Sequence, residues 1–285
     1  MANGRAAFAT VALVLAFGCG GGSPPSSPGL PPAVPTPTPT PPPPPAQPIT
    51  DILGFLDTCP AADPAYSQIR SDLTIRRNGV PVNDIPCVPP ASGQPNYTDE
   101  LIALQGFRLM YHMDAGLSGH LPWTPLRLYP WFVSQVGGVN IDDTATYNGC
   151  CQTFEGKPYI VLTHQDDFNR DFDRSWDGLS GNVMLYAHEA RHRAGFGHTS
   201  CCGINGGCDQ TYDEANLSTY GVQYWLARAW ARGDINVGLG CLGRSAGRNA
   251  VNWLIQSANG YVERFCDTRP PWVSYPAEAG GPCRM

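Results

Sequence analysis

The sequence predicts a single α+β domain, in which a small mixed sheet lies over one central helix and a helical part follows. Two features of the chain predict this class. Segments with strand character come early and the longest helical patterns come late, an order typical of α+β domains. In addition, a β-rich run at residues 159–163 shortly precedes a helical segment and three closely spaced histidines.

The early elements are a hairpin and a helix. Side chains alternate before Asn78-Gly79, which is a two-residue turn signal, so we expect a β-hairpin at residues 72–82. Thr98 can cap a helix that runs to about residue 114, because apolar side chains recur there at helical spacing.

The middle of the chain contains a second helix, a strand and a loop. We expect the helix at residues 126–136, where Pro130 kinks it or sets its start. The aromatic and β-branched run at residues 159–163 predicts a buried strand. The polar residues 166–176 predict a loop after it.

The segment from His188 to His198 reads H-E-x-x-H-x-x-G-x-x-H. A helix predicted at residues 182–194 places positions i and i+4 on one face, so His188 and His192 can direct two imidazoles at one ion. Gly195 suits the end of that helix, because glycine adopts a left-handed backbone without steric cost. The chain can then turn back and supply His198 as a third nitrogen. Three neutral nitrogens and a water form the open site of a catalytic zinc ion.

This motif resembles that of the metzincins, a clan of zinc endopeptidases among the zincins. The resemblance covers these eleven residues firmly and the rest of the chain loosely. It implies a zincin-like fold, a Zn²⁺ cofactor bound by His188, His192 and His198, and Glu189 as the general base. Metzincins also carry a Met in a tight turn beneath the zinc. Here no Met lies between His198 and Met285, so the chain departs from the family pattern at that point.

Two further site roles stay open. The gluzincins, another zincin branch, take their third ligand as a Glu on a later helix, and Glu214, with Asp213 beside it, is the alternative to His198. An acidic residue in the first turn of a helix is the plain interpretation of Glu214. A peptidase also needs a donor to the oxyanion, for which Tyr220 and Tyr212 are the nearest candidates. For both tyrosines the competing interpretation is packing in the core.

The later part of the domain is predicted to be mostly helical. Residues 199–212 form a loop rich in Cys and Gly, and residues 213–232 and 244–266 form two helices.

The N-terminal residues 1–18 have the pattern of an export signal, with an apolar run too short to span a bilayer. Gly18-Cys19 at its end resembles a bacterial lipoprotein cleavage site, so we expect a lipid on Cys19, with plain secretion as the alternative. Residues 19–50 hold 14 prolines and no charged side chain, a composition that favours an extended tether. The domain is therefore expected at residues 51–285.

Charge and cysteines limit the remaining possibilities. A net charge of −6 and the lack of a basic cluster give no electrostatic footprint for nucleic acid. Of the 11 cysteines, ten remain once Cys19 is set aside, which predicts a disulfide-rich domain with up to five bridges. The expected bridges are Cys59–Cys87, Cys266–Cys283, and ties between the Cys150/Cys151 pair and Cys201, Cys202 and Cys208. A zinc site formed by the thiolates of the last cluster is the alternative.

These observations predict an exported zinc endopeptidase of a bacterial cell envelope or surface, with peptide or protein as substrate. Its contact with the membrane is expected through the lipid anchor alone. The alternatives are a zinc amidase that acts on peptidoglycan peptides and a non-catalytic display module stabilised by its metal. Glu189 counts against the display module, because a structural metal site needs no base.

Overall fold

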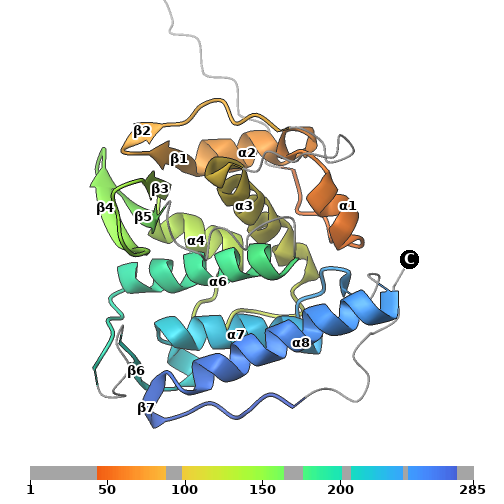
Figure 1. Cartoon of the computed structure of the whole chain (residues 1–285), viewed down its shortest axis with the longest axis vertical. Helices are drawn as coiled ribbons and strands as arrows, with labels where there is room; N and C mark the ends of the chain where they lie inside the picture. The colour runs from red at the N-terminus through yellow and green to blue at the C-terminus, as the bar shows by residue number, and fades with distance from the viewer. Residues whose placement is uncertain (1–43, 88–97, 164–175, 201–206, 240–242, 275–285) are drawn as a thin grey trace, which may run out of the picture. The chain divides into compact units, whose positions relative to one another are not determined.

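A computed structural model describes residues 44–87, 98–163, 176–200, 207–239 and 243–274 (Figure 1). The helices are α1 Ile52–Asp57, α2 Tyr66–Asp72, α3 Asp99–Gly116, α4 Leu128–Gln135, α6 Trp176–Arg193, α7 Thr219–Arg232 and α8 Gly243–Val262, with the 3₁₀ turns Pro60–Ala62 and Glu214–Asn216. The strands are β1 Thr74–Arg77, β2 Val80–Pro81, β3 Gly138–Asp142, β4 Gly149–Phe154, β5 Lys157–Thr163, β6 Asp209–Thr211 and β7 Phe265–Thr268. The protein is thus α+β, as predicted.

The last residues of the predicted tether contact the domain. Ile49 is buried, the backbone N–H of Gln47 donates to His112, and the carbonyl of Pro44 accepts from Tyr111. The predicted signal at residues 1–18 and Cys19 lie outside the described residues.

The main sheet has the strand order β2-β1-β3-β5-β4 and is mixed. Strands β1, β3 and β5 are parallel, and β2 and β4 pair antiparallel at the two edges. Ile75, Val139 and Ile160 lie side by side on the three parallel strands and are fully buried. Such a β-branched stripe is typical of parallel strands that are buried in a core.

Helix α6 lies between two parts of the domain (Figure 1). The sheet with α3 and α4 lies on one side of it, and α7 and α8 with the small β6–β7 sheet lie on the other. Its side chains Val183, Met184, Ala187 and Ala190 are buried, and Tyr186 packs against aromatic rings of α3 and α4. A helix buried on both sides is held firmly, which suits residues that must keep a fixed position.

Several predicted elements are confirmed. The hairpin turns at Asn78 and Gly79, which both have positive φ, and Thr98 accepts from the backbone N–H of Leu101 to cap α3. Helix α4 begins at Leu128 with Pro130 in its first turn, where proline leaves no helical hydrogen bond unmade. The predicted loop at 166–176 lies almost wholly outside the described residues.

The C-terminal predictions need two corrections. Residues 213–218 are not part of α7, because Asp213 caps a 3₁₀ turn and the helix starts at Thr219. The last predicted helix ends at Val262, and residues 265–268 form β7, which pairs with β6 inside the predicted loop. Burial of Phe265 against the core outweighs the helical pattern there.

The cysteine predictions are confirmed in part. Cys59–Cys87 is a disulfide, and Cys266 is also disulfide-bonded, although its predicted partner Cys283 lies outside the described residues. The expected ties from Cys150 and Cys151 are wrong, because these neighbours bond to each other. Cys208 is a buried free thiol, so the upper limit of five bridges among the ten cysteines is not reached. Strands β4 and β6 lie on different sides of α6 (Figure 1).

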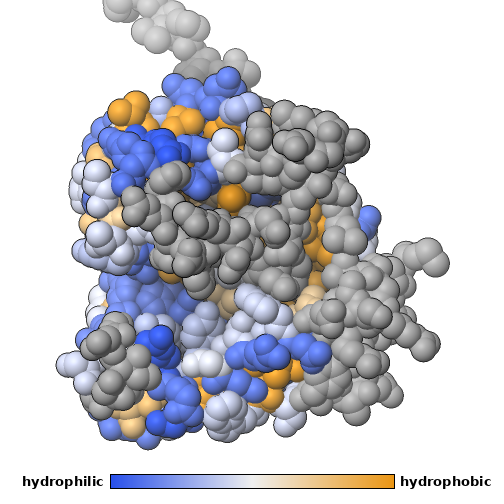
Figure 2. Space-filling model, viewed as in Figure 1, coloured by the Kyte–Doolittle hydropathy of each residue, from blue (hydrophilic) through white to orange (hydrophobic). Residues whose placement is uncertain are grey.

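The described surface carries few large exposed apolar side chains: Val80, Leu126, Tyr147 and Trp272. On the face drawn in Figure 2, hydrophilic residues dominate and the apolar patches are small. Among the described helices, none combines the length and apolarity needed to cross a bilayer.

Candidate metal centre

Three histidines meet at the end of α6. His188 and His192 are one turn apart on the helix, and His198 returns to them after the helix has ended. The metal-ligating atoms of the three side chains all lie within 4.8 Å of one another. The Nε2 atoms of His188 and His198 are 3.2 Å apart, a separation that brings two lone pairs together unless a proton or cation lies between them.

Two glycines allow His198 to reach this position. Gly195 has φ +95° and ends the helix, as the sequence predicted. Gly207 has φ +81°, and a Cβ atom there would lie 2.6 Å from the Cβ of His198. Backbone hydrogen bonds between Thr199 and Cys208 hold the two chain segments together at this point. The role of Gly207 carried no signal in the sequence, because the contact joins residues across a loop.

Each of the three imidazoles has an oxygen acceptor at its Nδ1 atom. The pairs are His188 with Gln223 Oε1 at 2.8 Å, His192 with the Phe196 carbonyl at 2.6 Å, and His198 with Asp209 Oδ1 at 3.3 Å. An acceptor at Nδ1 keeps the proton on that nitrogen and leaves the Nε2 lone pair free. Outer partners of this kind orient metal-binding histidines, so the ring set fits a metal ion bound through three Nε2 atoms.

The charge states also suit metal binding. Burial, together with the neighbouring imidazoles His192 and His198, lowers the pKa of His188 to about 3. Burial likewise lowers the pKa of His192. Both rings are therefore neutral at pH 7, which is the form that coordinates a cation.

Asp209 orients the third histidine. Its carboxylate is fully buried and accepts hydrogen bonds from the hydroxyls of Ser218 and Thr219 and from the backbone N–H groups of Tyr220 and Gly221. Burial alone would raise the pKa of Asp209, but hydrogen bonds from His198 and these donors hold the pKa below its usual range. The positive end of α7 favours the same ionised state.

Glu189 presents an unpaired oxygen to the histidines. The side chain is buried, and its Oε2 has no hydrogen-bond partner among the described residues although it lies 4.0 Å from His192 Nε2. The backbone N–H of Cys150 on β4 donates to the carboxylate. Burial raises the pKa of Glu189 to about 7. A buried acceptor without a donor is unfavourable, so this oxygen is suited to accept a hydrogen bond from a water beside the histidines.

The other residues proposed from the sequence lie elsewhere or in other roles. Glu214 is exposed and pairs with Arg228 at 3.5 Å, and Asp213 accepts from the backbone N–H of Ala215. Tyr212 packs its ring against Tyr224 and Phe265. Of the two possible third ligands, the structure therefore places His198 and not Glu214 with His188 and His192.

Tyr220 contacts two of the histidines with its ring. The ring centroids of Tyr220 and His188 are 4.7 Å apart, and those of Tyr220 and His198 are 4.8 Å apart. Reasoning from the sequence found Tyr220 but missed Gln223 and Asp209. Both reach the site from other elements, so the spacing of residues along the chain gave no signal for them.

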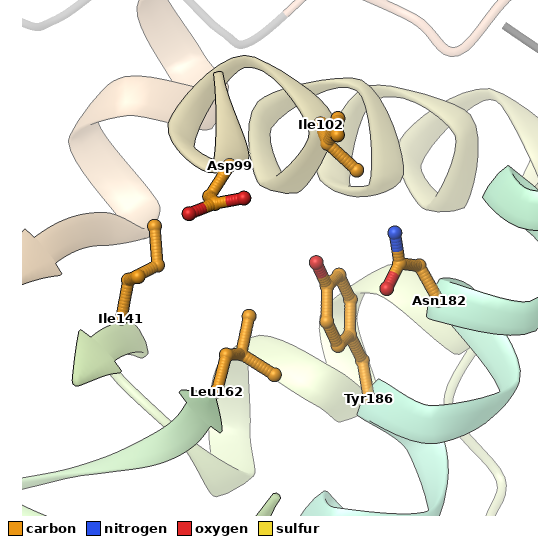
Figure 3. Close-up of a pocket in the computed structure, with 6 residues that line it drawn as sticks. All are labelled: Asp99, Ile102, Ile141, Leu162, Asn182 and Tyr186. Carbon is orange, nitrogen blue, oxygen red and sulfur yellow. The ribbon is translucent and has the colours of Figure 1, made fainter. Parts of the chain in front are cut away.

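A separate small cavity lies between α3, the ends of β3 and β5, and α6 (Figure 3). It is lined by Asp99, Ile102, Ile141, Leu162, Asn182 and Tyr186. The amide nitrogen of Asn182 has no hydrogen-bond partner in the described chain. With a volume of about 10 Å³, the cavity has the size of a single water rather than of a substrate.

No protein-family model, curated protein or solved structure matches the chain. The histidine cluster and its buried carboxylate therefore carry what can be inferred about function.

Proposed function

We propose that the protein is a zinc-dependent endopeptidase, with His188, His192 and His198 as ligands and Glu189 as general base. The observation that carries this proposal is the unpaired Oε2 of Glu189, buried beside three imidazoles that each have a free Nε2. A site that serves stability alone gains nothing from a buried carboxylate without a partner.

Zinc fits the donor set. Imidazole nitrogens suit zinc and other late transition metals, whereas calcium and magnesium prefer oxygen. Three protein ligands leave one position open, as in catalytic zinc sites. When bound, the ion would polarise a scissile carbonyl and lower the pKa of a water towards neutrality.

The protein's own groups move the proton. Glu189 accepts it from the attacking water and then donates it to the leaving amine. A carboxylate can serve both steps, because it accepts the proton in the first and returns it as a carboxylic acid in the second. The N–H of Cys150 restrains the carboxylate while Oε2 stays available.

Strand β4 supports a peptide as the substrate. It is the last strand of the main sheet and pairs with β5 along one side. The backbone N–H of Cys150 donates to the Glu189 carboxylate, so the side of β4 that pairs with no described strand begins beside the reactive group. An extended peptide can add to such an edge through backbone hydrogen bonds, which are independent of the peptide's sequence.

The finer features of the fold and location belong to the same proposal. The mixed sheet on one side of α6, the helices on the other and the histidine after Gly195 support a zincin-like fold of the metzincin type. The bridges Cys59–Cys87 and Cys150–Cys151 support an oxidising location outside the cytosol. An export signal and a lipid on Cys19 would deliver the protein there.

The test is Glu189→Gln, which keeps the shape of the side chain but cannot accept a proton at neutral pH. The variant should hold zinc like the wild type and lose about 100- to 10,000-fold in peptide cleavage. The assay is cleavage of a denatured protein and a mixed peptide library, with zinc content measured in parallel.

Each outcome of this assay bears on the proposal. Equal cleavage by wild type and variant would remove Glu189 from the base role. A zinc-loaded wild type that cleaves no peptide would refute the endopeptidase, and peptidoglycan fragments would then test the amidase. Inactivity on both substrates would favour the display module.

A further inference from the structure

The ring of Tyr220 packs against two rings of the histidine cluster, those of His188 and His198. The Tyr220 ring is nearly parallel to that of His198, at 27°, and meets the ring of His188 edge to face, at 72°. Both centroid separations fall within the range of favourable aromatic packing, about 4.5–7 Å. One side chain therefore restrains the planes of two of the three proposed ligands.

Two sets of contacts hold Tyr220 in place. At its backbone, the N–H donates to Asp209 Oδ2 at 2.7 Å, and Asp209 Oδ1 bonds His198. At its ring, Tyr261 of α8 lies 6.2 Å away between centroids, and the guanidinium of Arg264 lies 5.2 Å from the centroid. The ring thus lies between the histidines and a second set of side chains, so it has little freedom to move.

We propose that Tyr220 is a positioning residue of the metal centre, whose aromatic ring fixes the planes of His188 and His198 and so the meeting point of their Nε2 atoms. This inference rests on the proposed three-histidine metal site, but it does not depend on peptidase activity. Tyr220 would then pack against the metal site in a chain that lacks, between His198 and Met285, the Met that metzincins carry beneath the zinc.

The role belongs to the ring and not to the hydroxyl. The contacts to His188 and His198 are made by ring faces and edges, and phenylalanine would make the same ones. The sequence suggested a different role, in which the hydroxyl of Tyr220 donates to an oxyanion. The two roles differ in which substitution they tolerate.

The experiment compares Tyr220→Phe with Tyr220→Leu in the full chain. Zinc affinity is measured by competition with a chelator, and the geometry of the centre by the visible absorption spectrum after substitution with Co²⁺. Tyr220→Phe should bind zinc like the wild type and keep the cobalt spectrum. Tyr220→Leu should bind zinc about 10- to 100-fold more weakly, the usual effect of losing an outer partner, and should shift the spectrum.

Tyr212→Leu is the matched control. Tyr212 is also an aromatic residue close to the start of α7, but it packs against Tyr224 and Phe265. Its loss should lower the melting temperature and leave zinc affinity and the cobalt spectrum unchanged. If Tyr220→Leu fails to fold, Tyr220→Met replaces it, because the longer and more flexible Met side chain adapts to an irregular space without a ring and should weaken zinc binding in the same direction.

Two results would overturn the proposal. One is a folded Tyr220→Leu or Tyr220→Met protein with wild-type zinc affinity and an unchanged cobalt spectrum. The other is a folded Tyr220→Phe protein that binds zinc as weakly as Tyr220→Leu, which would assign the role to the hydroxyl and not to the ring. A wild type that binds no zinc would be a different failure, since it would remove the metal site itself.

Discussion

Two buried aspartates form hydrogen bonds with histidines on different sides of α6. The two pairs differ in whether the second ring nitrogen of the histidine remains available to bind a metal ion. Asp63 bonds Nε2 of His112 at 2.9 Å, and the Nδ1 of that ring accepts from the Gln47 backbone at 3.1 Å. Both nitrogens of His112 are therefore used within the protein. Asp209 bonds Nδ1 of His198, whose Nε2 faces His188.

The two aspartates also differ in whether a positively charged side chain neutralises the carboxylate. Asp63 forms a buried ion pair with Arg108 at 2.5 Å, and the Arg108 guanidinium also donates to the carbonyls of Phe55 and Thr58. Asp209 is surrounded by hydroxyls, helix N–H groups and a histidine. The Asp63 network is complete and stabilises the fold, whereas the Asp209 network leaves a negative charge and a free nitrogen that together suit a cation.

The largest effect is expected at Asp63. Replacing it with Asn leaves the buried guanidinium of Arg108 without its charge partner, which costs about 3–5 kcal/mol of unfolding free energy. Urea denaturation measures this loss. The zinc affinity of the folded variant should equal that of the wild type, and a large change in affinity would show that the two networks are coupled.

Asp209→Asn should have the opposite profile. The amide keeps the size of the side chain but no longer fixes the proton of His198, so zinc affinity should fall about 10- to 100-fold. The loss of unfolding free energy in the metal-free state should be smaller than for Asp63→Asn, because the partners of Asp209 are mostly neutral. Wild-type zinc affinity in this variant would contradict the role given to Asp209.

A fall in pH should weaken the contribution of the Asp63 network to the stability of the fold. Burial would raise the pKa of Asp63, but hydrogen bonds from His112 and Arg108 outweigh it and hold the pKa well below its usual range. A carboxyl group with a lowered folded-state pKa stabilises the protein above its unfolded pKa and loses that contribution as pH falls. The stability of the metal-free wild type should therefore drop below about pH 4. Asp63→Asn should show a shallower drop, and equal slopes would contradict this contribution.

The smallest effect is expected at Glu214. Its carboxylate is 58% exposed and pairs with Arg228, and exposed pairs are worth about 0–1 kcal/mol. Glu214→Gln should change neither zinc content nor stability measurably. A loss of zinc would instead restore Glu214 as the third ligand and displace His198.

The sequence predicted the parts of this comparison that depend on local spacing. His188, Glu189 and His192 follow from helical geometry, and the return of His198 follows from the freedom of Gly195. The hairpin at Asn78-Gly79 likewise has a local cause.

The parts that the sequence did not predict depend on contacts between distant segments. Asp209 reaches the N-terminus of α7 from β6, and Gln223 reaches His188 from within α7. The bond between Cys150 and Cys151 was missed because the even number of cysteines suggested longer bridges. Strand β7 was missed because the helical pattern in the sequence continues to residue 266. The pairing of Phe265 with β6, which places that side chain in a buried position, is a contact between distant segments.

X-ray absorption at the zinc edge of the purified protein tests the central claim most directly. Three free Nε2 atoms predict a first shell of imidazole nitrogens at about 2.0–2.1 Å with oxygen in the open position. The variants His188→Ala and His192→Ala should each purify without zinc. Sulfur at about 2.3 Å, or full zinc in both variants, would contradict the three-histidine centre and point to thiolate ligands instead.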